Sequence, residues 1–171
     1  MPEQIAAKPV YFVDPYSDPV LVRIEGRANF QNGGCLRDFI TEMLRQGKKR
    51  FVVDFHHCTS MDSTFLGVLA GVALDLRKNG WGGSMALMRV GPRNLEIIKN
   101  MGLHRLMVVE GGEMPVDGGN PVKTLDCPDR SELENAQLAL EAHENLVAAD
   151  ERNRSKFQDV LVFLKTRVEK R

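Results

Sequence analysis

Apolar and polar positions alternate along the first 110 residues in a way that predicts strands and helices in turn. Short runs rich in β-branched and aromatic residues predict five strands, at residues 10–13, 20–24, 50–55, 84–90 and 106–109. Between them, apolar residues recur at helical spacing and predict three helices, at about residues 32–47, 62–80 and 92–102. This order favours a mixed β-sheet with helices packed on it, because parallel strands need crossover connections.

The pattern changes after residue 110. Residues 111–125 are rich in glycine and proline and predict a connecting loop. Residues 126–171 contain no glycine, and two apolar stripes at helical spacing predict two helices with a break near Asn153. We therefore expect an α/β protein with a mixed sheet of about five strands in residues 1–110, a loop at 111–125, and a helical C-terminal extension at 126–171.

Charge is balanced over the whole chain, with 23 basic and 23 acidic side chains among 171 residues. Without excess positive charge, direct binding to nucleic acid or to an anionic membrane is not expected. The distribution is uneven, because the net charge is +2 over residues 1–125, −7 over residues 126–151 and +5 over residues 152–171. Oppositely charged C-terminal helices favour an antiparallel hairpin or docking on a charged surface, and they leave a homodimer through these helices open.

Several features favour a cytoplasmic protein. The first residues lack the apolar segment of a signal peptide, and the longest apolar stretch, residues 64–74, is too short to span a bilayer. Three cysteines, Cys35, Cys58 and Cys127, are odd in number and widely spaced, so we expect all three to be reduced thiols. No residue spacing indicates a cofactor or a metal site.

The start of the second predicted helix carries the most informative chemistry. Asp62, Ser63 and Thr64 are residues of the kind that cap helices. Because a helix start has unpaired N–H groups and the positive end of the helix dipole, a phosphate on Ser63 would be favourable there. Gly67 and Gly71 follow one turn apart, where missing Cβ atoms would allow close approach to the sheet.

This region closely resembles the anti-sigma factor antagonists of the STAS-domain family. In that family a buried strand leads into a D-S-[ST]-G-L-G-like segment at the start of the second helix. The matching stretches here are the strand Phe51-Val52-Val53-Asp54-Phe55, the motif D-S-T-x-L-G at residues 62–67, Glu25-Gly26-Arg27, and Gly102-Leu103-His104-Arg105-Leu106. The resemblance extends over roughly residues 9–110.

The resemblance implies a binding module rather than an enzyme. Its partner would be an anti-sigma factor that is also a serine protein kinase, and binding would release a sigma factor. Phosphorylation of Ser63 by this kinase would end the binding, and a serine phosphatase would restore it. The expected partner-binding residues lie in the loop before Ser63, at the start of the helix and in an adjacent loop: Arg27, Asn29, Thr59, Ser60, Met61, Asp62, Ser63 and Thr64.

Departures from the family pattern leave alternatives open. Phe65 stands where the family has a small residue, so its ring belongs either to the core or to the docking surface. Asn29 replaces an aspartate near the phosphoacceptor, and Thr64 offers a second hydroxyl group. Thr64 is therefore an alternative phosphoacceptor. Phe65, Asn29 and the C-terminal extension favour the alternative of a non-phosphorylated STAS scaffold or a subunit of a signalling complex.

Two other kinds of chemistry have less support. A small hydrolase would need a histidine base beside Ser63 and an oxyanion hole, and no spacing in the sequence indicates either. His56 and His57 are adjacent at the end of a predicted strand, so their side chains are expected on opposite faces and unable to bind one metal ion.

Overall fold

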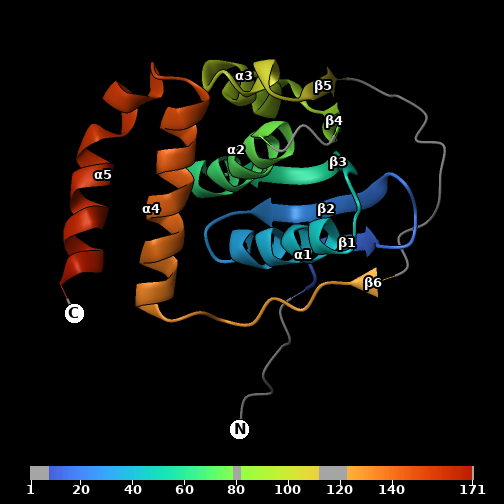
Figure 1. Cartoon of the computed structure of the whole chain (residues 1–171), viewed down its shortest axis with the longest axis horizontal. Coiled ribbons are helices and arrows are strands. Elements are labelled where there is room, and N and C mark those ends of the chain that lie inside the picture. The colour runs from blue at the N-terminus through green and yellow to red at the C-terminus, as the bar shows by residue number, and fades with distance from the viewer. Residues whose placement is uncertain (1–7, 79–81, 112–122, 171) are drawn as a thin grey trace, which may run out of the picture.

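A computed structural model describes residues 8–78, 82–111 and 123–170 of the chain. Its centre is a six-stranded sheet in the order β5-β4-β3-β2-β1-β6 (Figure 1). The strands are β1 (Tyr11–Asp14), β2 (Val20–Ala28), β3 (Arg50–Met61), β4 (Ser84–Val90), β5 (Val108–Gly111) and β6 (Lys123–Thr124). Strand β1 pairs antiparallel with both β2 and β6, whereas β2, β3, β4 and β5 pair in parallel.

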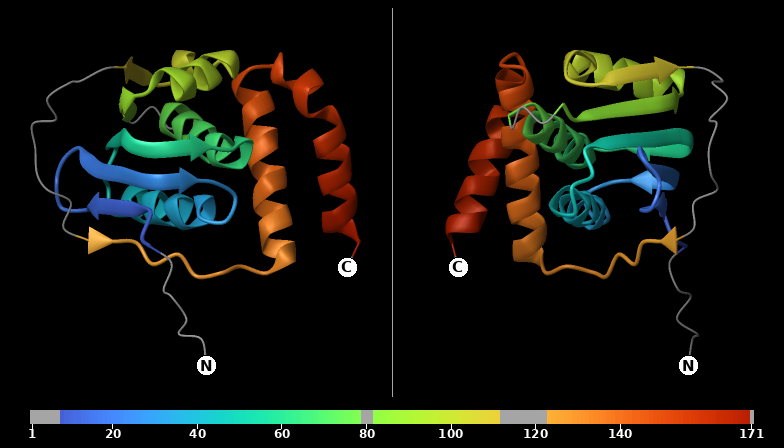
Figure 2. Two further views of the ribbon diagram at one scale, coloured as in Figure 1. Left: turned by 180° about the vertical axis from the view of Figure 1, so that it is seen from behind. Right: turned by 45° about the vertical axis from the view of Figure 1, so that its right-hand side comes forward.

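Helices α1 (Gly33–Arg45) and α2 (Ser63–Lys78) lie together on one face of the sheet (Figure 2). Alternation along β3 explains this arrangement, because Phe51, Val53 and Phe55 share one face of the strand and are almost completely buried. Helix α3 (Pro92–Asn100) begins with proline at its first position, and a short 3-10 helix, η1 (Leu103–Arg105), follows it.

The C-terminal residues form an antiparallel pair of helices, α4 (Glu132–Ala149) and α5 (Asn153–Glu169), which we call the C-terminal hairpin (Figure 1). Ser131 begins α4 with a capping box, in which its hydroxyl accepts from the Glu134 N–H and the Glu134 carboxylate accepts from the Ser131 N–H. At this same end of α4, Arg167 near the end of α5 donates to Glu132 at 3.0 Å. The predicted hairpin is therefore confirmed.

The α/β class with a mixed sheet and two C-terminal helices is also confirmed, with two differences in the sheet. It has six strands rather than about five, because β6 has only two residues and is too short to show an alternating pattern. Strand β3 continues to Met61 rather than ending at Phe55, because its polar end pairs with the end of β2 through register shifts. Residues 112–122 of the predicted loop lie outside the described residues.

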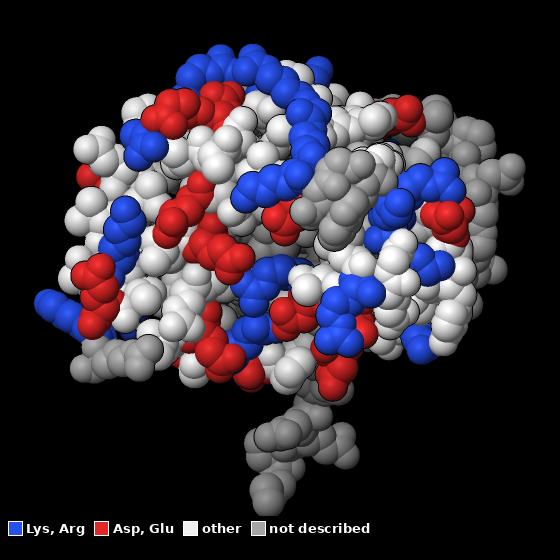
Figure 3. All heavy atoms as spheres, viewed as in Figure 1, with Lys and Arg blue, Asp and Glu red and all other residues white. Residues whose placement is uncertain are grey.

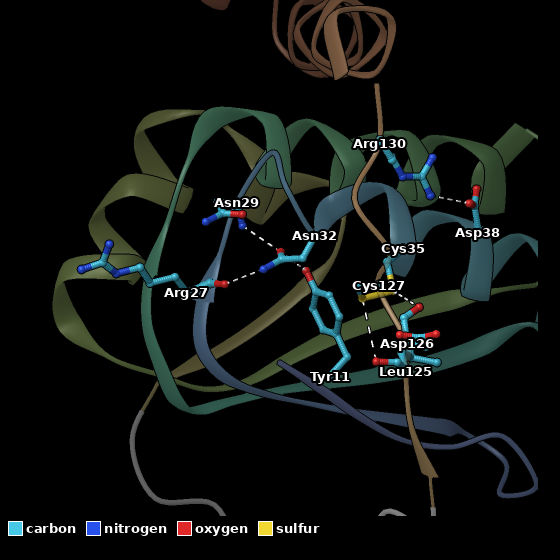
Figure 4. Close-up of a disulfide and its surroundings, with 10 residues drawn as sticks. All are labelled: Tyr11, Arg27, Asn29, Asn32, Cys35, Asp38, Leu125, Asp126, Cys127 and Arg130. Atoms are coloured by element: carbon cyan, nitrogen blue, oxygen red, sulfur yellow. Dashed lines mark hydrogen bonds and ion pairs between the residues drawn. A yellow bond between two sulfur atoms is a disulfide. The ribbon is translucent and has the colours of Figure 1, made fainter. Parts of the chain in front are cut away.

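The expectation of three reduced cysteines is wrong for two of them. Cys35 of α1 and Cys127 form a disulfide across a sequence separation of 92 residues (Figure 4). Pairing of β6 with β1, continued by a hydrogen bond from the Leu125 N–H to the Tyr11 carbonyl, brings residue 127 beside α1. Three cysteines still allow one disulfide, and Cys58 is the thiol that remains free. The odd count therefore does not exclude such a pair.

Gly67 and Gly71 face α4, not the sheet as expected. A Cβ atom built on Gly67 would overlap the backbone of Ala142, and one on Gly71 would overlap the side-chain amide of Asn145. The missing side chains thus allow α4 to lie directly on α2, which is covered by the sheet on one side and by α4 on the other. None of the described helices is long and apolar enough to cross a membrane.

We predict that Gly67→Ala lowers the free energy of unfolding by about 1–3 kcal/mol, because the carbonyl of Ala142 belongs to a helix backbone and cannot move aside cheaply. Gly33→Ala is the matched control, since its Cβ would meet a Val68 methyl group at an ordinary 3.6 Å. Urea unfolding of both variants measures the difference. Equal stabilities would contradict the close packing of α4 on α2.

Candidate functional site

Asp62 fixes the point at which β3 passes into α2. One carboxylate oxygen accepts from the Phe65 N–H at 2.9 Å, which caps the helix, and the other accepts from the Phe30 N–H at 2.8 Å. The Asp62 N–H donates to the Ala28 carbonyl at 3.2 Å. A single side chain therefore joins the start of α2 to the segment that connects β2 with α1.

Asn32 organises this connecting segment (Figure 4). Its side-chain oxygen accepts from the Tyr11 hydroxyl at 2.6 Å and from the Asn29 N–H at 2.9 Å, and its amide group donates to the Arg27 carbonyl at 2.8 Å. Burial, with smaller contributions from Cys58 and Asp62, raises the pKa of Tyr11 far above its ordinary value. Tyr11 therefore stays neutral and remains a donor to Asn32.

The residues predicted to contact a partner come together at this end of the sheet. Strand pairing sets Arg27 opposite Ser60, and Asn29 follows directly after the end of β2. Thr59, Ser60 and Met61 belong to the end of β3 rather than to a loop, and the first two are exposed. Two segments that are 30 residues apart in the sequence thus border the start of α2.

Ser63 itself is half-buried beneath α4 rather than open to solvent. Its hydroxyl lies 2.8 Å from Nε2 of His143, while Nδ1 of the same ring lies 2.6 Å from the Ala139 carbonyl. Because a carbonyl can only accept, Nδ1 carries the proton, and in the neutral ring Nε2 accepts from the Ser63 hydroxyl. The His143 ring also packs edge-on against Phe157 of α5, with ring centroids 4.9 Å apart.

His143 is the site residue that reasoning from sequence missed. It lies in an apolar stripe of α4, and the pattern alone predicts a core position for any residue in such a stripe. In the structure His143 is 4% exposed. A histidine within an otherwise apolar stripe is the signal that could have identified it. Although Ser63 and His143 lie at the distance of a nucleophile and its base, the buried ring cannot reach a substrate unless α4 moves.

The neighbouring residues bear on two of the alternatives left open by the sequence. Phe65 is fully buried and packs edge-on against Phe55, with ring centroids 6.3 Å apart, so it belongs to the core. Thr64 is 5% exposed, which makes its hydroxyl less accessible than that of Ser63. The rings of His56 and His57 contact each other on β3 instead of pointing apart, with centroids 4.6 Å apart.

Comparison with known proteins identifies the fold of residues 13–110. A family model described as "Mlab, STAS domain" matches residues 13–110. The anti-sigma factor antagonist SpoIIAA in its unphosphorylated form is 16% identical, with a TM-score of 0.50 over 61% of this chain and 89% of that chain. The phosphorylated form, the Bacillus cell fate determinant SpoIIAA, is 20% identical, with a TM-score of 0.49 over 60% of this chain and 92% of that chain.

At 16% identity the unphosphorylated SpoIIAA structure shows a shared fold and no more. The family model covers more than half of the chain and includes all of the elements from β2 to η1. The C-terminal hairpin lies outside the matched residues. On this basis the chain belongs to the STAS-domain family.

Proposed function

We propose that the protein is a binding module of the anti-sigma factor antagonist type, with Ser63 as a phosphoacceptor that switches the binding. The observation that carries the proposal is the convergence of Arg27, Asn29 and the end of β3 around Asp62 and Ser63 at the start of α2. The partner would be a serine protein kinase that acts as an anti-sigma factor. Such a partner uses ATP, so we also propose a cytoplasmic location.

Phosphorylation would change the charge of this site. The Ser63 oxygen would attack the γ-phosphorus of ATP, the bond to the bridging oxygen of ADP would break, and a base of the kinase would take the hydroxyl proton. The product would carry about −1.5 to −2 additional charge beside Asp62. The start of α2 can accommodate this charge, while a partner docked over the same surface would be repelled. A serine phosphatase would hydrolyse the ester and restore the hydroxyl.

We predict that the serine protein kinase proposed as the partner, when supplied with MgATP, modifies Ser63, and that Ser63→Asp weakens binding to that kinase at least about tenfold. Ser63→Ala should bind like the unmodified protein. Ser84→Ala, at the exposed start of β4, is the control for loss of a serine hydroxyl outside the site. Phosphopeptide mass spectrometry and isothermal titration measure the two effects. An unmodified Ser63 peptide from active kinase reactions, run both with the Cys35–Cys127 disulfide intact and with it reduced, would refute the proposal.

A second candidate function is a scaffold that dimerises through the C-terminal hairpin. Leu133, Val160 and Phe163 are large apolar residues exposed on its outer surface, and Phe163 is 62% exposed. Leu133 and Phe163 border a hollow of about 600 Å³ that is open towards solvent. A second copy is the proposed occupant, because an antiparallel arrangement would set the acidic α4 of one copy against the basic α5 of the other.

If the hairpin dimerises in this way, Phe163→Lys should raise the dissociation constant of the dimer at least about tenfold. Tyr16→Lys is the matched control, since Tyr16 is a 71% exposed aromatic residue that lies outside the hairpin. Sedimentation equilibrium over a range of concentrations measures the constant. A protein that is monomeric at every concentration would exclude this candidate while leaving the Ser63 switch untouched.

A further inference from the structure

The C-terminal hairpin covers the surface at which the STAS domain would be modified. Helix α4 lies on the first half of α2, next to the carboxyl ends of β2 and β3 (Figure 1). Its contacts there are specific: the backbone at Ala142 lies against Gly67, the Asn145 amide donates to the Gly67 carbonyl at 3.2 Å, and His143 bonds to Ser63. The start of α2 therefore already has an occupant within the same chain.

This occupant blocks the reaction proposed for Ser63. The hydroxyl is in hydrogen-bond contact with Nε2 of His143, so a phosphoryl group has no room between the two atoms. Because His143 is 4% exposed, its ring is held within the packing of α4 and cannot simply turn into solvent. A kinase could therefore reach the Ser63 oxygen only after α4 has moved away from α2.

Contacts at both ends hold α4 in place. At the end nearer α3, the Asn153 side-chain amide donates to the carbonyls of Met101 and Leu146 at 3.0 and 2.8 Å, and Lys156 donates to the Asn100 carbonyl. These bonds join the turn of the hairpin to the segment between α3 and η1.

At the other end, the segment before α4 is joined to α1 (Figure 4). Arg130 forms an ion pair with Asp38 at 2.7 Å, and the Cys35–Cys127 disulfide adds a covalent bond four residues before the capping residue Ser131. The ion pair is partly exposed and contributes little by itself. The disulfide is thus the strongest attachment at this end, and it is also reversible.

We propose that the C-terminal hairpin is a cover over Ser63 and that the Cys35–Cys127 disulfide is a redox-controlled latch for this cover. Control of phosphorylation by the disulfide rests on the proposed role of Ser63, whereas the attachment of the hairpin by the disulfide does not. A dithiol reductant releases it: one thiolate attacks a sulfur of the disulfide and frees one cysteine, and the second thiolate then displaces the other cysteine. Two electrons pass to the protein, and the reductant becomes a cyclic disulfide.

Reduction weakens the cover by lengthening its tether. With the disulfide intact, α4 begins a few residues from a covalent anchor on α1 and stays at a high effective concentration next to α2. Without the disulfide, the same segment is held by the two-residue pairing of β6 with β1 and by Arg130. Opening of α4 should then become more frequent by about tenfold or more, in line with the usual contribution of a disulfide.

Hydrogen exchange of the full-length protein tests the latch without any kinase. Peptides from residues 62–72 and 132–149 should exchange about tenfold faster after dithiothreitol treatment, while peptides from residues 84–98 keep their rate. The double variant Cys35→Ser with Cys127→Ser should match the reduced protein. Cys58→Ser removes the free thiol and keeps the disulfide, so it should behave as the oxidised protein does.

Exchange that is unchanged by dithiothreitol would overturn the latch, as would faster exchange that extends equally over residues 84–98, because the disulfide would then support the whole domain. The dithiothreitol experiment uses the wild-type protein, so its outcome does not depend on whether the double variant folds. A subsequent kinase reaction separates the two proposals. Faster exchange with no phosphate on Ser63 would refute the phosphoacceptor role alone, whereas equal phosphorylation of oxidised and reduced protein would refute the cover.

Discussion

The close approach of α4 to α2 at Gly67 is the contact on which the arrangement of this protein depends. Only a residue without a Cβ atom allows the backbone at Ala142 to lie against α2. The same approach places His143 over Ser63 and Asn145 over the Gly67 carbonyl. Apolar packing and the close approach of the α2 and α4 backbones, rather than charged residues on the surface, therefore determine where the hairpin lies.

Surface charge has a smaller and different role. Basic and acidic side chains are interspersed over most of the face that carries the helices, and a continuous band of basic side chains follows its upper edge (Figure 3). Some acidic groups of the hairpin pair with the STAS domain rather than with α5, as Glu141 does with Arg37 at 2.7 Å. Exposed pairs of this kind contribute about 0–1 kcal/mol each, so they select the orientation of the hairpin more than they stabilise it. The uneven charge of the C-terminal residues thus serves both the hairpin and its docking.

The parts that could be predicted from sequence are those encoded by neighbouring residues. Asp62 and Ser63 are predictable because capping is a local property, and the strand before them shows its own alternation. His143 lies 80 residues from Ser63, and a periodic pattern describes only which face of a helix is apolar, not which helix it meets. For the same reason the pattern assigned Gly67 to the sheet instead of α4. The disulfide joins residues 92 apart, and no pattern within either segment records it.

The two attachments of α4 differ in a way that sets the direction in which the cover can open. At the α3 end, Asn153 is fully buried with both amide hydrogens donated to carbonyls, and no reagent reverses those bonds selectively. Hydrogen bonds from Arg152, and the charge of Arg105, lower the pKa of the adjacent Asp150 to about 2, so this turn keeps its ion pairs at any ordinary pH. At the α1 end a disulfide can be broken and remade. A reductant can break the attachment at the α1 end and leaves the attachment at the α3 end intact. The hairpin would therefore swing about the turn at residues 150–153, and the start of α4 would leave the domain first.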